Sequence, residues 1–158
     1  MAVDYFLTMT GIEGEAQNAS FTNQVQLLSW SWGAANMSSV SGTTGSGAGK
    51  VDLSDFSCMT NFDKSTPAFF KNIVKGAHVA TGTMSALKAG GGTKPYLKVN
   101  FTEIFITGLQ MSASSEAPSV SVSFTYASIE IDYSVQSAEG DLTSVGPVSF
   151  NQKTGVAS

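Results

Sequence analysis

The sequence predicts an all-β fold: a small, mainly antiparallel β-barrel or sandwich with one short docked α-helix. Apolar residues recur at every second position in most patterned segments, which is typical of strands with one buried face. Only one segment has helical periodicity, and it does not alternate with strands as in a parallel α/β fold. The 158 residues are expected to form a single domain, residues 1–158, which needs no disulfide or metal to bury a core.

The first two expected strands are Ala2–Met9 and Val25–Gly33. The first alternates regularly along its length. The second changes its apolar face at Leu28, because its apolar residues continue from there at even positions, Trp30 and Trp32. A change of face within one strand implies a bulge. Both tryptophans are predicted to be core anchors.

The segment Ala34–Lys50 is rich in glycine and serine and has no apolar face. It is predicted to be a long loop, and long loops without structure of their own are usually functional or mobile. A third strand, Val51–Met59, is expected to follow it, again with a shift of its apolar face.

One helix is predicted at about residues 66–75. Ser65 and Thr66 supply a cap, Pro67 stands at the first helical position, and Gly76 ends the helix. A helix of three turns is unstable alone, so its apolar side must dock on the sheet. The residues assigned to that side are Phe69, Phe70, Ile73 and Val74.

Four further strands are expected at His78–Lys88, Tyr96–Met111, Ser119–Gln136 and Val148–Phe150. Tyr96–Met111 is apolar on both faces, and Ile104 and Ile106 lie opposite its main apolar row. A strand of this kind is either covered on both sides or exposed as an interface. In Ser119–Gln136 the apolar face changes between Tyr126 and Ile129, as at the corner of a barrel.

The composition indicates a surface that contacts other protein. Charged residues make up 13% of the chain, against about 25% in typical soluble domains, and arginine is absent. An uncharged Ser/Thr-rich monomer is the alternative. The net charge of −4 argues against nucleic-acid binding, which needs clustered basic residues. No run of about 18 apolar residues is present, so no membrane insertion is expected.

The residues offer little chemistry. His78 is the single histidine and Cys58 the single cysteine, too few for a Cys/His metal site. The run Gly45-x-Gly47-x-Gly49-Lys50 lacks the spacing of a phosphate-binding loop. We therefore predict no catalytic residue, metal or cofactor. A small hydrolase using His78, and a monomeric ligand-binding β-domain, remain as alternatives.

Six segments in order along the chain carry a resemblance to a known family. They are residues 2–7, Leu28–Gly33, Ala48–Val51, Asp63–Pro67, Ile129–Tyr133 and Gly146–Val148. Together they resemble the haemolysin-coregulated protein (Hcp) family of type VI secretion. Phage tail-tube proteins share the general architecture and are the alternative family for this sequence.

The resemblance implies a structural subunit and not an enzyme. Family members form six-membered rings that stack into a hollow tube inside a contractile sheath. The tube carries a spike at its tip and small secreted effectors in its lumen. The protein is expected in the cytoplasm before assembly and is then exported through the apparatus, consistent with a start that does not resemble a signal peptide.

The resemblance also assigns candidate residues. Ser31 and Ser29 are candidates for the lumen wall, because they alternate with the two tryptophans. The candidates for subunit interfaces are Ile104, Ile106, Met37, Val40 and Lys50.

Overall fold

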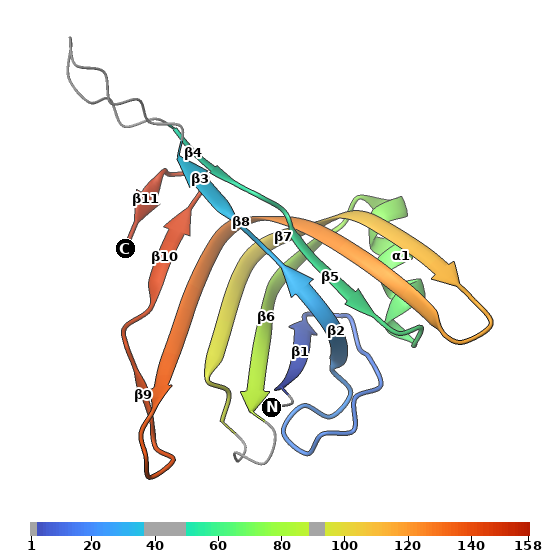
Figure 1. The fold of residues 1–158 in the computed structure, drawn as a ribbon. Coiled ribbons are helices and arrows are strands. Elements are labelled where there is room, and N and C mark those ends of the chain that lie inside the picture. Colours follow the sequence, from blue (N-terminus) through green and yellow to red (C-terminus); the bar gives the residue numbers. More distant parts are fainter. Residues whose placement is uncertain (1–2, 37–49, 89–93) are drawn as a thin grey trace.

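The computed structural model describes residues 3–36, 50–88 and 94–158. Antiparallel strands dominate it, and one helix lies at the side (Figure 1). In chain order the elements are β1 (Val3–Met9), β2 (Val25–Ser31), β3 (Ala34–Asn36), β4 (Val51–Leu53), β5 (Phe56–Thr60), α1 (Ser65–Lys75), β6 (His78–Lys88), β7 (Leu97–Ala113), β8 (Pro118–Gln136), β9 (Leu142–Ser144), β10 (Val148–Asn151) and β11 (Val156–Ala157).

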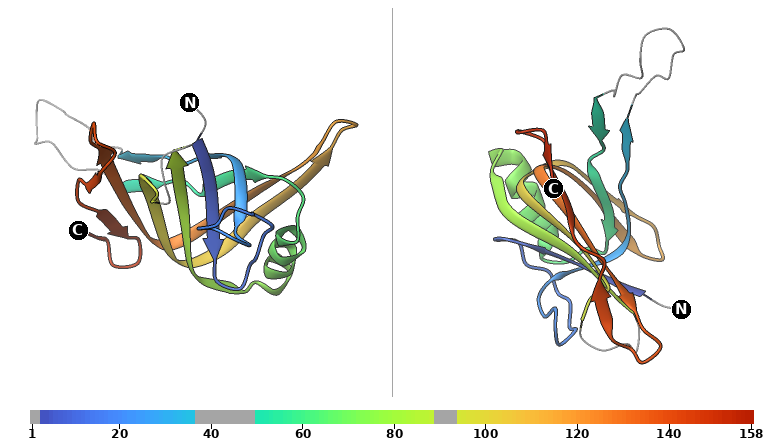
Figure 2. Two further views of the ribbon diagram at one scale, coloured as in Figure 1. Left: turned by 90° about the horizontal axis from the view of Figure 1, so that it is seen from below. Right: turned by 90° about the vertical axis from the view of Figure 1, so that its left-hand side faces the viewer.

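Six strands close into a barrel in the order β8-β5-β2-β1-β6-β7, and β7 pairs back onto β8. Every pairing is antiparallel. This confirms the predicted fold class. Outside the barrel, β9, β10 and β11 extend the sheet from β8, while β3 and β4 form a separate ribbon that projects from the barrel (Figure 2).

Phe56 of β5 lies at the centre of the barrel core and is fully buried. Its ring packs against Trp30, Phe101 and Phe124, with centroids 5.7, 5.1 and 5.1 Å away. These aromatic contacts join four different strands, so the core depends on the closed barrel and not on any one hairpin.

The face change in β2 is a bulge, since its register with β5 shifts between Leu27 and Ser29. Trp30 and Trp32 are half-buried and pack against the core from its margin. Leu28, expected beside them, is instead 54% exposed because it occupies the bulge itself. The change of face was therefore predicted correctly, but the half-buried even-numbered positions begin at Trp30 and not at Leu28.

The predicted second apolar face of β7 is wrong. Ile104 is completely buried and Ile106 is 8% exposed, so neither is available as a surface contact. Glu103 has a positive φ of 48°, and beyond it the buried positions pass from odd to even residues. β8 changes its buried face at the same level, between Tyr126 and Ile129, as the sequence predicted.

Helix α1 begins two residues before Pro67, and its start is stabilised by Asp63. The Asp63 carboxylate accepts a hydrogen bond from the backbone N–H of Ser65 at 2.8 Å, in place of the expected Ser-Thr cap. Gly76 ends the helix in the left-handed conformation, with φ of 61°. This conformation favours glycine and confirms the predicted C-terminus.

Only one stripe of α1 faces the core. Phe69 is fully buried and Ile73 is half-buried against the same cluster. Phe70 and Val74, also assigned to the core, are 58% and 68% exposed. They lie about 100° further round the helix, and the barrel contacts only the Phe69 side.

The prediction of a loop at Ala34–Lys50 is wrong for its first three residues. Ala34–Asn36 forms β3, which pairs with Val51–Leu53. The single strand predicted at Val51–Met59 is in fact two strands. β4 pairs with β3 in the projecting ribbon, while β5 pairs with β2 in the barrel. Met37 and Val40 lie outside the described residues.

Neighbouring phenylalanines on α1 provide a test of this packing. We expect Phe69→Ala to lower the free energy of unfolding by about 3–5 kcal/mol, because it opens a cavity in the core. Phe70→Ala should change it by less than about 0.5 kcal/mol. Urea unfolding at concentrations where the protein is a single chain measures both values. Equal losses would contradict the assignment of faces.

Cys58 provides a second test, because it is buried between β2 and β8 and burial raises its pKa to about 12. At pH 8 roughly one thiol in ten thousand is then ionised, and reaction requires the thiolate. We expect no labelling of the native protein by a thiol reagent, and complete labelling in denaturant. Rapid native labelling would place Cys58 at the surface.

Candidate functional site

The outward side of the wall formed by β2, β5, β8 and β7 is lined by uncharged residues, most of them serine. Registers between these strands align two rows across all four of them. One row contains Ser31, Ser57, Ser123 and Gly108, and the next contains Ser29, Met59, Ser121 and Gln110. We call these eight residues the serine face.

The serine face contains no charged residue. Asp55 lies at its margin, where its carboxylate accepts a hydrogen bond from the Thr107 hydroxyl at 2.8 Å. Gly108 packs closely on its neighbour, because a Cβ there would lie 2.6 Å from the Ser123 hydroxyl oxygen, which would have to rotate away. Ser29 and Ser31, the two residues predicted at a lumen wall, are both exposed on this face. The periodicity of the sequence indicated their orientation, but it did not bring the other six residues together with them.

The same four strands end in two open edges. Pairing of β2 with β1 stops at Leu27, and pairing of β7 with β6 stops at Phe105. Within the described residues, Leu28–Ser31 and Leu109–Ala113 therefore have no strand partner on their outer side. Neither segment contains proline or a charged residue, the usual protection of an edge strand. We call these two segments the open edges.

The directions of the two open edges are opposite. β2 is antiparallel to β5, β5 to β8 and β8 to β7. Consequently β2 and β7 run in opposite directions along the wall.

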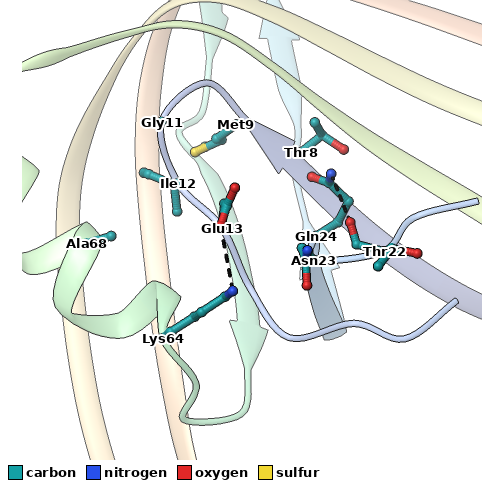
Figure 3. Close-up of a pocket in the computed structure, with 10 residues that line it drawn as sticks. All are labelled: Thr8, Met9, Gly11, Ile12, Glu13, Thr22, Asn23, Gln24, Lys64 and Ala68. Atoms are coloured by element: carbon teal, nitrogen blue, oxygen red, sulfur yellow. Dashed lines mark hydrogen bonds and ion pairs between the residues drawn. The ribbon is translucent and has the colours of Figure 1, made fainter.

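A groove of about 540 Å³ lies between the β1–β2 connection and the start of α1 (Figure 3). Glu13 and Lys64 face each other across it, with carboxylate and ammonium 3.6 Å apart. They are the titratable side chains that line it, and the backbone N–H of Lys64 also donates to Glu15 at 3.0 Å. The groove pairs its charges internally and presents no nucleophile next to a base.

His78 lies on the surface with its ring against Phe105, the centroids 3.9 Å apart. Nearby, Glu103 forms an ion pair with Lys153, which lowers the pKa of the Glu103 carboxyl. In the described part of the chain, His78 makes no hydrogen bond to a serine or threonine hydroxyl, and no three His, Cys, Asp or Glu side chains cluster as metal ligands.

Lys50, the remaining interface candidate, is exposed immediately before β4. Among the residues that the structure describes, no helix is long and apolar enough to cross a membrane.

The chain is similar to known proteins in sequence and in fold. Residues 6–133 match the family described as "Type VI secretion system effector, Hcp". Protein hcp1 of Pseudomonas aeruginosa is 30% identical over 153 residues, which cover 95% of this chain and 94% of that protein.

Solved structures share the fold over almost the whole chain. A structure of a type six secretion system protein has a TM-score of 0.92 and 21% identity, and the match covers 99% of this chain and 100% of the other. Hcp1 from Salmonella typhimurium has a TM-score of 0.80 and 23% identity, with the same coverage.

Proposed function

Because the chain belongs to the Hcp family of type VI secretion proteins, we propose that it is a structural subunit of the secretion tube. Six copies form a ring, and rings stack into a hollow inner tube. The observation that carries this proposal is the pair of open edges at the two ends of one four-stranded wall.

Joining the open edges gives a head-to-tail assembly. Such a contact uses two different surfaces of each subunit, and it closes into a ring when the rotation between neighbours divides a full turn. The opposite directions of β2 and β7 make the junction antiparallel, like every other pairing in the wall. The backbone groups of both edges then gain hydrogen-bond partners across the junction.

In such a ring the serine faces of neighbouring copies become continuous. We propose that they line the lumen and that small effector proteins are carried there. Short hydroxyl side chains leave the most room for cargo, and Ser31 lies in the row that crosses the wall at Ser57 and Ser123. The absence of charge on this face avoids binding cargo too tightly for release.

The remaining roles follow from the family. The tube carries a spike protein at its tip and lies within a contractile sheath, and the subunit passes from the cytoplasm through the apparatus to the outside or into a target cell. The protein acts without catalysis. A phage-like tail tube is the alternative assembly, and a monomeric ligand-binding domain is the alternative without assembly.

The mass in solution tests the ring. Light scattering after size exclusion, across a concentration series, should give six times 16.4 kDa, about 98 kDa. Met111→Lys, a 58%-exposed residue in the middle of the β7 open edge, should raise the concentration needed for assembly at least tenfold, because the lysine is desolvated at the junction.

The matched control is Ser115→Lys, which adds the same charge in the exposed turn of the β7–β8 hairpin. It should assemble as the parent protein does. A parent protein that remains at 16.4 kDa at every concentration contradicts the ring itself, whereas equal assembly of both variants contradicts the edge junction.

Cargo export tests the lumen. Ser31→Gln adds bulk on the serine face, so we expect normal rings but at least several-fold less effector in culture supernatant, measured by quantitative mass spectrometry against a tube-deficient strain. Ser20→Gln, in the exposed β1–β2 connection, is the control and should export normally. Unchanged export by the Ser31 variant would remove this serine from the cargo path.

A further inference from the structure

Helix α1 carries an apolar stripe that the barrel leaves uncovered. Phe70 and Val74 are one helical turn apart and are 58% and 68% exposed. Lys71 and Lys75 follow them directly in sequence and are also exposed. We call Phe70 and Val74 the helix stripe.

A second uncovered apolar surface lies on the extension of the sheet beyond the barrel. Tyr133, Val135 and Val148 are 44%, 49% and 66% exposed. Val148 pairs with Ile131, and alternation along β8 places Tyr133 and Val135 on the same side. Val145, 64% exposed, donates its backbone N–H to the Tyr133 carbonyl at 3.0 Å. We call these four residues the C-terminal apolar face.

Exposed charges of opposite sign lie beside the two surfaces. Helix α1 contains two exposed lysines, Lys71 and Lys75, and no acidic residue, while Lys64 before it is paired with Glu13. Of the four acidic residues from residue 130 onward, Glu130 and Asp132 lie on the reverse side of β8 from Tyr133 and Val135, and Lys98 is in register with Asp132 there. On β6, the Lys88 ammonium donates a hydrogen bond to Gln136 at 3.2 Å. Two of the acids, Glu139 and Asp141, are exposed in the turn between β8 and β9, next to Val135.

One copy cannot join these surfaces to each other. Helix α1 and the strands β9 to β11 lie at opposite sides of the molecule, as both Figure 1 and the left view of Figure 2 show. A second copy presents the required partner surface without any rearrangement of the fold.

We propose that the helix stripe of one subunit packs against the C-terminal apolar face of the next, head to tail. This contact adds to the edge junction of the ring proposed above and rests on that assembly. It assigns to α1 a role in holding subunits together, beyond closing the barrel core through Phe69.

Cysteine cross-linking tests this contact directly. The variant Val74→Cys with Val148→Cys places one thiol on each surface, at positions exposed enough to leave the fold intact. The native Cys58 is buried and does not compete. After mild oxidation of the assembled protein by copper phenanthroline, a non-reducing gel should show a ladder of covalent multimers. Each single-cysteine variant should yield dimers at most.

Val74→Cys with Val156→Cys is the matched control. Val156 is 60% exposed on the same C-terminal hairpin, but its pairing with Asn151 places it on the reverse side from Val148. This pair should produce no ladder. A ladder of the test pair that ends at six chains supports the contact between neighbours within a ring. A ladder that continues past six overturns it, because the contact then joins consecutive rings.

Absence of a ladder in protein that light scattering shows to be about 98 kDa, six times 16.4 kDa, overturns this contact and leaves the ring standing. Absence of a ladder in protein that stays at the mass of a single chain overturns both. Equal ladders from the test and control pairs also overturn the contact, because they indicate random collision between exposed thiols.

Discussion

The structure depends on the antiparallel pairing of β7 with β8, which runs from Leu97 opposite Tyr133 to Ala113 opposite Pro118. This pairing closes the barrel. Both strands extend beyond the strands that flank them, β6 beside β7 and β5 beside β8. Beyond β6, β7 continues as an open edge, and beyond β5, β8 continues into the sheet formed with β9 and β10. The core, the edge and the C-terminal apolar face therefore arise from one pair of strands.

A closed barrel of only six strands requires its long strands to coil strongly. This requirement explains two backbone irregularities. Glu103 adopts positive φ, and β2 contains a bulge at Leu28, each at a level where the buried face changes. Such irregularities increase local twist and let a sheet turn a corner. They also expose side chains such as Leu28 and Phe105 that an even alternation would bury.

The unusual composition fits a protein whose surface contacts other copies. A monomer gains solubility from charge, whereas charge at a subunit interface or in a passage must be desolvated or matched. The serine face and both open edges contain no charged residue. The two edges proposed to join subunits and the face proposed to line the lumen are therefore uncharged.

The sequence by itself determined most of the strands, the end of the helix at Gly76 and the changes of face in β2 and β8. Each of these depends only on neighbouring residues: on the alternation of apolar residues, on a glycine after the helix, and on a shift in that alternation. It also indicated that Ser29 and Ser31 face away from the tryptophans. Only the tertiary structure decided which apolar faces are covered. Ile104 was expected at the surface and Phe70 in the core, and both are reversed. The physical reason is that periodicity defines faces relative to one another, while burial depends on which distant strand packs against each face.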